Sequence, residues 1–140
     1  MSVNAADIKI GETRESVLVD DLKRTRIVQY AGASGDFNPL HTDNRFATET
    51  AGYPGVFAHG MLTMGMTGRV LTDWVGPEAL LRFGVRFKAQ VWPGDTLTAT
   101  ATVESVEVTP DGPVAHFALR TVTQDGAEVV TGTATARLEP

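Results

Sequence analysis

The sequence predicts an α+β fold in which one long helix packs against an antiparallel sheet of four or five strands. Residues 60–75 place apolar side chains on every side of a helix, which indicates a helix buried on all sides. From residue 83 onward the chain alternates apolar and polar residues with a period of two, as strands do. Short turn signals separate the alternating segments, and consecutive strands joined by short turns pair antiparallel.

Length and composition predict one domain that comprises residues 1–140. Hydrophobic residues make up 42% of the chain and charged residues 21%, values typical of a globular domain with a proper core. The sequence contains no cysteine, which excludes disulfide scaffolds, thiolate metal sites and cysteine nucleophiles.

Charge and hydropathy argue against further classes of function. The net charge is −5, and no basic run is longer than Lys23-Arg24, which argues against a nucleic-acid partner. The N-terminus lacks the cationic and apolar regions of a signal peptide, and no apolar segment is long enough to span a membrane. We therefore expect a cytoplasmic protein with no membrane partner.

The first third of the chain is predicted to contain a short strand followed by a helix. Residues 17–19 form a brief β-prone run, and residues 22–31 have the apolar spacing of a helix. Asp20 or Asp21 can cap that helix, because a carboxylate accepts hydrogen bonds from the unpaired N–H groups of a first turn. Glycine and proline then interrupt every periodic pattern over residues 33–40.

Two helical segments are expected in the middle of the chain. The first is a short piece around residues 44–48, and the second is the long helix at residues 60–75. Gly65 and Gly68 each cost that helix about 1 kcal/mol relative to alanine. Two compensations remain open, namely close packing of the backbone or space left for a ligand chain.

The second half of the chain is predicted to form strands. Apolar and polar residues alternate over residues 83–91 and 97–104, and two further strands are expected at residues 114–123 and 127–138. The alternation changes phase near Ser105, which predicts a β-bulge there. Three turn signals separate the segments: Pro93-Gly94-Asp95, Pro110-Asp111-Gly112-Pro113 and Gln124-Asp125-Gly126.

Residues 34–41 form the densest cluster of reactive and turn-forming side chains. One interpretation is a simple turn between two helices, stabilised by an Asx-turn. The other is that Gly35 and Pro39 shape a loop that directs the Asp36 carboxylate and the His41 imidazole toward one point. A carboxylate and a histidine that converge on one water can exchange its protons, which is general acid–base catalysis.

A second candidate site, Ala58-His59-Gly60-Met61, opens the long helix. In the simpler interpretation Gly60 permits a tight entry into the helix, and His59 caps or packs against it. In the functional interpretation the unpaired N–H groups of the first turn stabilise negative charge that develops on a carbonyl oxygen.

Other polar residues support weaker hypotheses. Asp36, His41 and His59 are possible metal ligands by type, but no familiar ligand spacing supports this, so we expect no metal. His116 lies on a predicted strand and is expected to be structural. Three basic residues indicate either a solvated strand face or a local patch for an anionic substrate: Arg82, Arg86 and Lys88.

Two motifs together resemble the signature of MaoC-like (R)-specific enoyl-thioester hydratases. The first is Tyr30-Ala31-Gly32-Ala33-Ser34-Gly35-Asp36-Phe37-Asn38-Pro39-Leu40-His41, followed by Ala47 after five intervening residues. The second is Ala58-His59-Gly60-Met61-Leu62. The resemblance extends over roughly residues 8–138. It departs at Ala33, where the signature prefers Val, Leu, Ile or Gly, and we expect no catalytic consequence.

The resemblance implies a hot-dog fold, in which an antiparallel sheet wraps around a long central helix. It also implies a dimer with an acyl-thioester tunnel near the subunit interface, and no metal or redox cofactor. Residues 58–65 and 72–76 look especially like an actinobacterial dehydratase subunit of fatty-acid synthesis. That subunit acts on acyl carrier protein thioesters with a non-identical partner, whereas stand-alone hydratases act on coenzyme A thioesters as homodimers. Both carriers and both assemblies remain open.

The implied reaction is reversible hydration of trans-2-enoyl thioesters to (R)-3-hydroxyacyl thioesters. We expect Asp36 and His41 to be catalytic and to activate the water that adds to the β-carbon. Gly60 and Asn38 are the expected binding residues, with the Gly60 N–H on the thioester carbonyl and Asn38 fixing the loop or hydrogen-bonding Asp36. Two alternatives are a non-catalytic acyl-thioester-binding subunit of a heterodimeric dehydratase and a hot-dog thioesterase.

Overall fold

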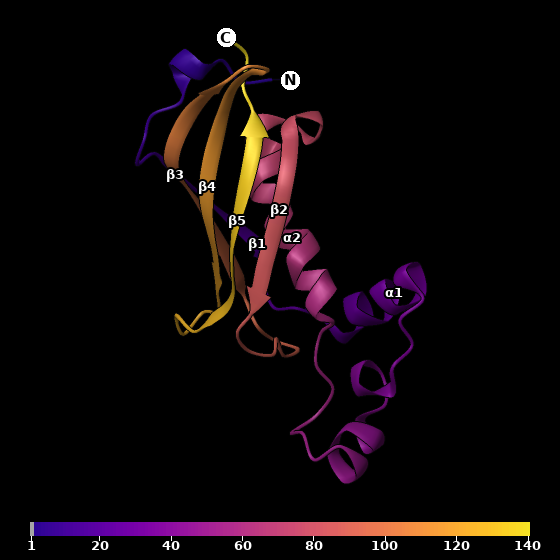
Figure 1. Cartoon of the computed structure of the whole chain (residues 1–140). Coiled ribbons are helices and arrows are strands. Elements are labelled where there is room, and N and C mark those ends of the chain that lie inside the picture. Colours follow the sequence, from indigo (N-terminus) through magenta and orange to yellow (C-terminus); the bar gives the residue numbers. More distant parts are fainter. Residues whose placement is uncertain (1) are drawn as a thin grey trace.

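A five-stranded antiparallel sheet lies against one long helix, α2 (Gly60–Val75), in the computed structural model, which describes residues 2–140 (Figure 1). The strand order is β1-β3-β4-β5-β2, so that β1 and β2 form the two edges. The strands are β1 (Thr13–Val19), β2 (Leu80–Phe87), β3 (Leu97–Thr109), β4 (Gly112–Val122) and β5 (Glu128–Arg137). Both the predicted α+β class and the hot-dog arrangement are confirmed.

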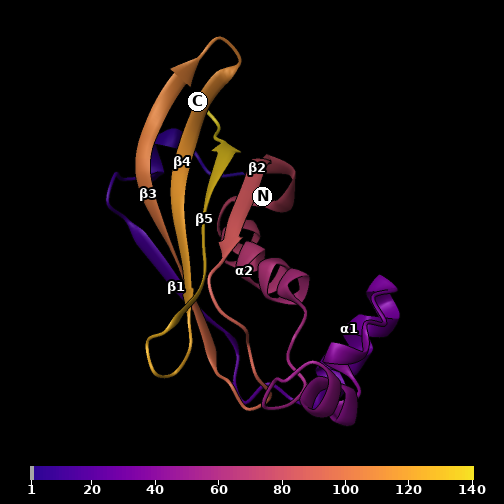
Figure 2. The same ribbon diagram turned by 60° about the horizontal axis from the view of Figure 1, so that its bottom comes forward.

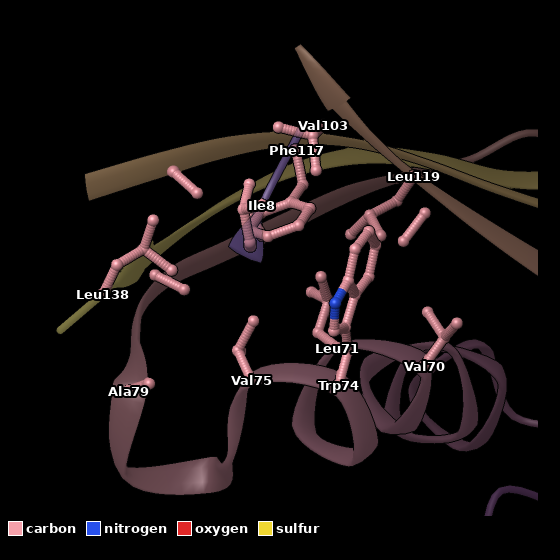
Figure 3. Close-up of a cluster of buried hydrophobic side chains, with 14 of the residues drawn as sticks. Ile8, Val70, Leu71, Trp74, Val75, Ala79, Val103, Phe117, Leu119 and Leu138 are labelled. Carbon is pink, nitrogen blue, oxygen red and sulfur yellow. The ribbon is translucent and has the colours of Figure 1, made fainter. Parts of the chain in front are cut away.

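The core lies between α2 and the sheet. Alternate residues of the strands point toward the helix, and Leu71, Trp74 and Phe117 are at most 5% exposed. Figure 3 shows the α2 side chains directed toward those of β3 and β4. The rings of Trp74 and Phe117 meet edge to face, with 5.3 Å between their centroids. Burying one side chain of this size stabilises the fold by about 1.5–3 kcal/mol.

One face of α2 is exposed, so the prediction of a helix buried on all sides is wrong. Met61, Gly65, Arg69 and Asp73 are exposed and follow one another at intervals of four residues. That spacing places them on a single stripe of the helix. The stripe ends in the pair Arg69–Asp73, with 3.9 Å between guanidinium and carboxylate. The many apolar residues of α2 disguise this polar stripe in the sequence.

The strand predictions hold with two adjustments at their ends. The register of β3 against β4 shifts between Val103 and Ser105, which confirms the predicted bulge. The predicted strand at residues 83–91 ends at Phe87, and the chain then continues as a loop toward Val91. Strand β1 has seven residues, whereas the sequence predicts only the last three. Its first four residues are all polar, so they show no alternation of apolar and polar residues that would predict a strand.

The helices of the first third stand apart from the sheet. Helix α1 (Arg24–Ser34), the 3-10 turn η2 (Pro39–His41) and the π-helical turn η3 (Phe46–Thr50) lie beyond the N-terminal end of α2 (Figures 1 and 2). We name residues 24–59 the overhang. The helical piece expected around residues 44–48 falls on η3.

Neither aspartate caps helix α1, contrary to the prediction. The cap position is Lys23, whose side chain makes no capping hydrogen bond. Asp20 Oδ1 accepts a hydrogen bond from the Thr96 hydroxyl at 2.8 Å, and the Asp21 N–H donates to Thr96 Oγ1 at 3.2 Å. The two aspartates therefore hold the entry of the overhang to the start of β3. Among the described residues, no helix is long and apolar enough to cross a membrane.

Candidate active site

The first motif occupies the turn between α1 and η2. Helix α1 ends at Gly35, whose φ of 74° lies in the left-handed region that favours glycine. The chain then turns so that Asp36 Oδ2 lies 4.0 Å from His41 Nε2. The Asp36 side chain is 51% exposed and that of His41 is 10% exposed. The structure thus brings together the two residues that the sequence predicts to be catalytic.

His41 is oriented by the carbonyl group of Phe57. Its Nδ1 lies 2.7 Å from Phe57 O. Because a carbonyl oxygen only accepts hydrogen bonds, Nδ1 carries the proton that is donated. Nε2 is therefore the ring nitrogen that faces Asp36 and is placed to exchange a proton, as a general acid–base group requires.

Asn38 fixes the loop that carries Asp36. The Asn38 N–H donates to Asp36 Oδ1 at 3.2 Å, and Asn38 Oδ1 accepts from the Leu40 N–H at 3.0 Å, capping η2. One carboxylate oxygen of Asp36 is thereby held by the backbone, and the other faces His41. The Asn38 side chain is committed to the backbone of its own loop.

The second motif packs directly on the first through His59. This side chain is 2% exposed, its Nε2 donates to Asp36 O at 3.1 Å, and its ring stacks on that of His41 with 3.8 Å between centroids. The Tyr30 ring makes a T-shaped contact with the His59 ring, with 4.8 Å between centroids. His59 sits at the cap position of α2 without a capping hydrogen bond, so it packs rather than caps. Both histidines stand out in the sequence, but no spacing rule predicts their stacking.

The geometry suits an acid–base pair better than a metal site. One ligand atom each from Asp36, His41 and His59 lies within 4.8 Å of the others. However, the two imidazole planes are only 27° apart. The lone pairs of stacked rings run side by side and do not converge on one ion, as coordination requires. The carbonyl contacts of His41 Nδ1 and His59 Nε2 leave His41 Nε2 as the nitrogen that faces Asp36.

A cavity of about 260 Å³ opens beside the start of α2. Its apolar wall consists of Phe57, Ala58, Phe87, Val91, Val129 and Val130. Gly60 also lines it, and a Cβ on Gly60 would lie 3.1 Å from the Phe87 ring, so only glycine fits without a shift. The Gly60 N–H belongs to the first helical turn and has no intrahelical acceptor. Phe57 connects the two halves of the site, since it lines the cavity and holds His41.

The remaining sequence candidates lie apart from the pair. His116 is on β4, and its Nε2 lies within hydrogen-bond distance of Glu107 Oε2, at 3.0 Å, on the surface. Arg82, Arg86 and Lys88 are exposed, and within the described residues none of them is paired with a carboxylate. Only Lys88 lines the cavity.

The chain matches the family model described as MaoC like domain over residues 5–125. It belongs to the MaoC-like domain family. This MaoC-like chain is 32% identical to the (R)-specific enoyl-CoA hydratase of Aeromonas caviae, with 97% of this chain and 99% of that enzyme covered. It is 37% identical to the (R)-specific enoyl-CoA hydratase of Rhodospirillum rubrum, with 92% of this chain and 87% of that enzyme covered.

A solved structure of an (R)-hydratase from A. caviae superposes on this MaoC-like fold with a TM-score of 0.82, at 31% identity and with 96% of this chain and 99% of that chain covered. The resemblance that the two sequence motifs predict is thus confirmed.

Proposed function

We propose that this protein is a hydro-lyase that interconverts trans-2-enoyl thioesters and (R)-3-hydroxyacyl thioesters in fatty-acid metabolism. The single observation that supports it most is the meeting of Asp36 Oδ2 and His41 Nε2 at 4.0 Å. The relatives named above, which match nearly the whole chain, act on enoyl-CoA thioesters according to their names.

Asp36 and His41 would hold one water between them. In the hydration direction the water oxygen forms the new bond to the β-carbon, and one water proton passes to the pair. The electron pair of the double bond moves onto the α-carbon and the carbonyl, and the pair returns a proton to the α-carbon. No net proton is consumed, so the same two groups can run the dehydration.

The Gly60 N–H would hold the thioester carbonyl oxygen. Negative charge develops on this oxygen as water adds, and the exposed N–H groups at the start of a 16-residue helix stabilise it. The cavity beside Gly60 has an apolar wall, in which such an interaction is stronger than in water.

We further propose that two copies of the chain form the active enzyme. Strand β2 is an edge of the sheet and presents unpaired backbone groups. Leu81 and Phe87 on this strand are 49% and 52% exposed. The site itself is open on one side, where Phe37 beside Asp36 is 69% exposed. A second copy that pairs along β2 would cover the exposed apolar side chains of this strand. A site closed in this way would separate the thioester from bulk solvent.

The test is hydration of crotonyl-CoA by the purified protein alone, followed as loss of enoyl absorbance. Formation of the (R)-3-hydroxy thioester, established by chiral analysis, is the expected result. Release of free thiol instead would identify a thioesterase. A folded protein that hydrates neither coenzyme A nor acyl carrier protein thioesters until a second hot-dog chain is added would contradict the self-sufficient enzyme and support a subunit of a heterodimer.

A further inference from the structure

Two buried polar atoms near the start of α2 have no hydrogen-bond partner in the described part of the chain. They are His59 Nδ1 and Thr63 Oγ1, and the Thr63 residue as a whole is 2% exposed. Buried hydroxyl groups in folded proteins nearly always have a partner, because an unpaired one destabilises the fold. The unpaired hydroxyl of Thr63 therefore indicates a partner that arrives from outside the protein.

Thr63 lines the same cavity as Gly60. The two residues are three positions apart in α2 and so lie on one face of the helix. The rest of that wall is mainly apolar, with Phe87, Val129 and Val130 facing the cavity. Thr63 therefore contributes a hydroxyl group to a largely apolar wall next to the helix N-terminus.

The next threonine of α2 shows what a purely structural hydroxyl looks like. Thr67 is 0% exposed, and its Oγ1 lies 2.7 Å from Thr121 Oγ1 on β4. Thr63 has the same residue type and nearly the same burial one turn earlier. The difference is that Thr67 has its partner within the fold.

We propose that the Thr63 hydroxyl donates a hydrogen bond to the thioester carbonyl oxygen, beside the bond from the Gly60 N–H. This inference rests on the proposed function and deepens it, since it makes the carbonyl site a two-donor site. The carbonyl oxygen can accept two hydrogen bonds, and it needs them most when it becomes enolate-like. Because the described residues of the free protein give the hydroxyl no hydrogen-bond partner, none of their bonds has to break when the substrate binds.

Thr63→Val tests the proposal, since valine keeps the shape and removes the hydroxyl. We expect kcat/KM for crotonyl-CoA to fall about 10²-fold, mostly through kcat. We expect the unfolding temperature to stay unchanged or to rise, because an unpaired buried hydroxyl is replaced by a methyl group. Thr63→Ser should restore most of the activity. Thr67→Val is the matched control, and it should lower the unfolding temperature because Thr121 loses its partner.

A Thr63→Val enzyme with unchanged kcat/KM would overturn the proposal, as would a fall in unfolding temperature like that of Thr67→Val. Measuring the affinity for butanoyl-CoA, a saturated thioester, distinguishes failure of the Thr63 proposal from failure of the proposed hydratase function. If the wild-type protein binds butanoyl-CoA but hydrates nothing, the hydratase fails, and weaker binding by Thr63→Val would still support the donor. If the wild-type protein does not bind the thioester, both proposals are wrong.

Discussion

At the scale of single residues, His41 has one ring nitrogen committed to a carbonyl and the other free for chemistry. His41 Nδ1 makes the 2.7 Å hydrogen bond to Phe57 O, and His41 Nε2 faces the Asp36 carboxylate. The His59 ring stacks on the His41 ring and helps to hold it in this orientation. The two residues proposed to react, Asp36 and His41, are therefore already positioned in the free protein.

Asp36→Asn and His41→Ala should each lower kcat for crotonyl-CoA by at least about 10²-fold, because each removes a proton-transfer group. The exposed Asp36 side chain contributes little to the core, so the unfolding temperature of Asp36→Asn should change little. His116→Ala removes a surface histidine that is paired with Glu107 and serves as the control. A folded His41→Ala protein with wild-type activity would contradict the mechanism.

Much of this site is predictable from the sequence, and the missing part has a physical reason. Asp36, Asn38 and His41 share one short loop, so turn-forming residues alone indicate that they lie close together. The stacking of His59 on His41 and the unpaired state of Thr63 depend on how α2 meets the overhang. Such contacts between segments far apart in the chain leave no periodic pattern for sequence analysis to detect.

At the scale of elements, the two glycines of α2 have different surroundings. A Cβ on Gly68 would lie 3.1 Å from the Phe83 ring, whereas nothing lies within 4 Å of one on Gly65. Close packing therefore explains Gly68, and Gly65 lies on the exposed stripe of the helix. The sequence leaves open whether these glycines allow close packing or make space for a ligand chain. For Gly68 the structure shows close packing against Phe83 of β2.

Gly65→Ala should raise the free energy of unfolding by about 1 kcal/mol, because alanine is the better helix former and has room. Gly68→Ala should lower it by about 1–2 kcal/mol, since forcing Phe83 aside costs more than the helix gains. Urea denaturation of both variants measures the sign of each change in the free energy of unfolding. A destabilised Gly65→Ala protein would mean that another surface, such as a second subunit, approaches the helix at this position.

At the scale of the whole molecule, the fold was predictable because its signals are periodic. The alternation of β3 and the length of α2 establish a sheet packed on a helix. The sequence does not reveal the exposed stripe of α2, because Met61 and Gly65 do not mark a solvent face as clearly as charged residues do. The predicted capping of α1 by Asp20 or Asp21 is wrong because both residues hydrogen-bond Thr96, which is about 75 residues away.

Leu81→Asp should convert a dimer into a monomer, because it places a charge on the exposed edge strand β2. Light scattering should then report the 15.0 kDa mass of one chain rather than twice that value. Activity should fall together with the mass. Val108→Asp alters a residue that is 87% exposed near the β3–β4 turn and should change neither. A fully active wild-type monomer would contradict the proposed assembly.

The carrier of the acyl chain can be tested through Lys88, which lines the cavity of an acidic protein and pairs with no carboxylate among residues 2–140. Lys88→Ala should raise KM for crotonyl-CoA about two- to five-fold, as expected for an exposed contact with a phosphate. It should leave KM for the N-acetylcysteamine thioester, which has no phosphate, unchanged. Arg82→Ala is the control away from the cavity. An equal effect on both substrates would rule out a phosphate contact.

Three hydrogen bonds join residues 36–41 to residues 57–59. They run from His41 Nδ1 to Phe57 O, from the Phe57 N–H to Leu40 O, and from His59 Nε2 to Asp36 O. Each segment is therefore oriented by the other, although 15 residues separate them in the chain. A chimera that takes only one segment from a distant relative should lose the alignment of acid and base. Exchanged together, the two segments form a transferable module, and recombination between such enzymes must treat them as one unit.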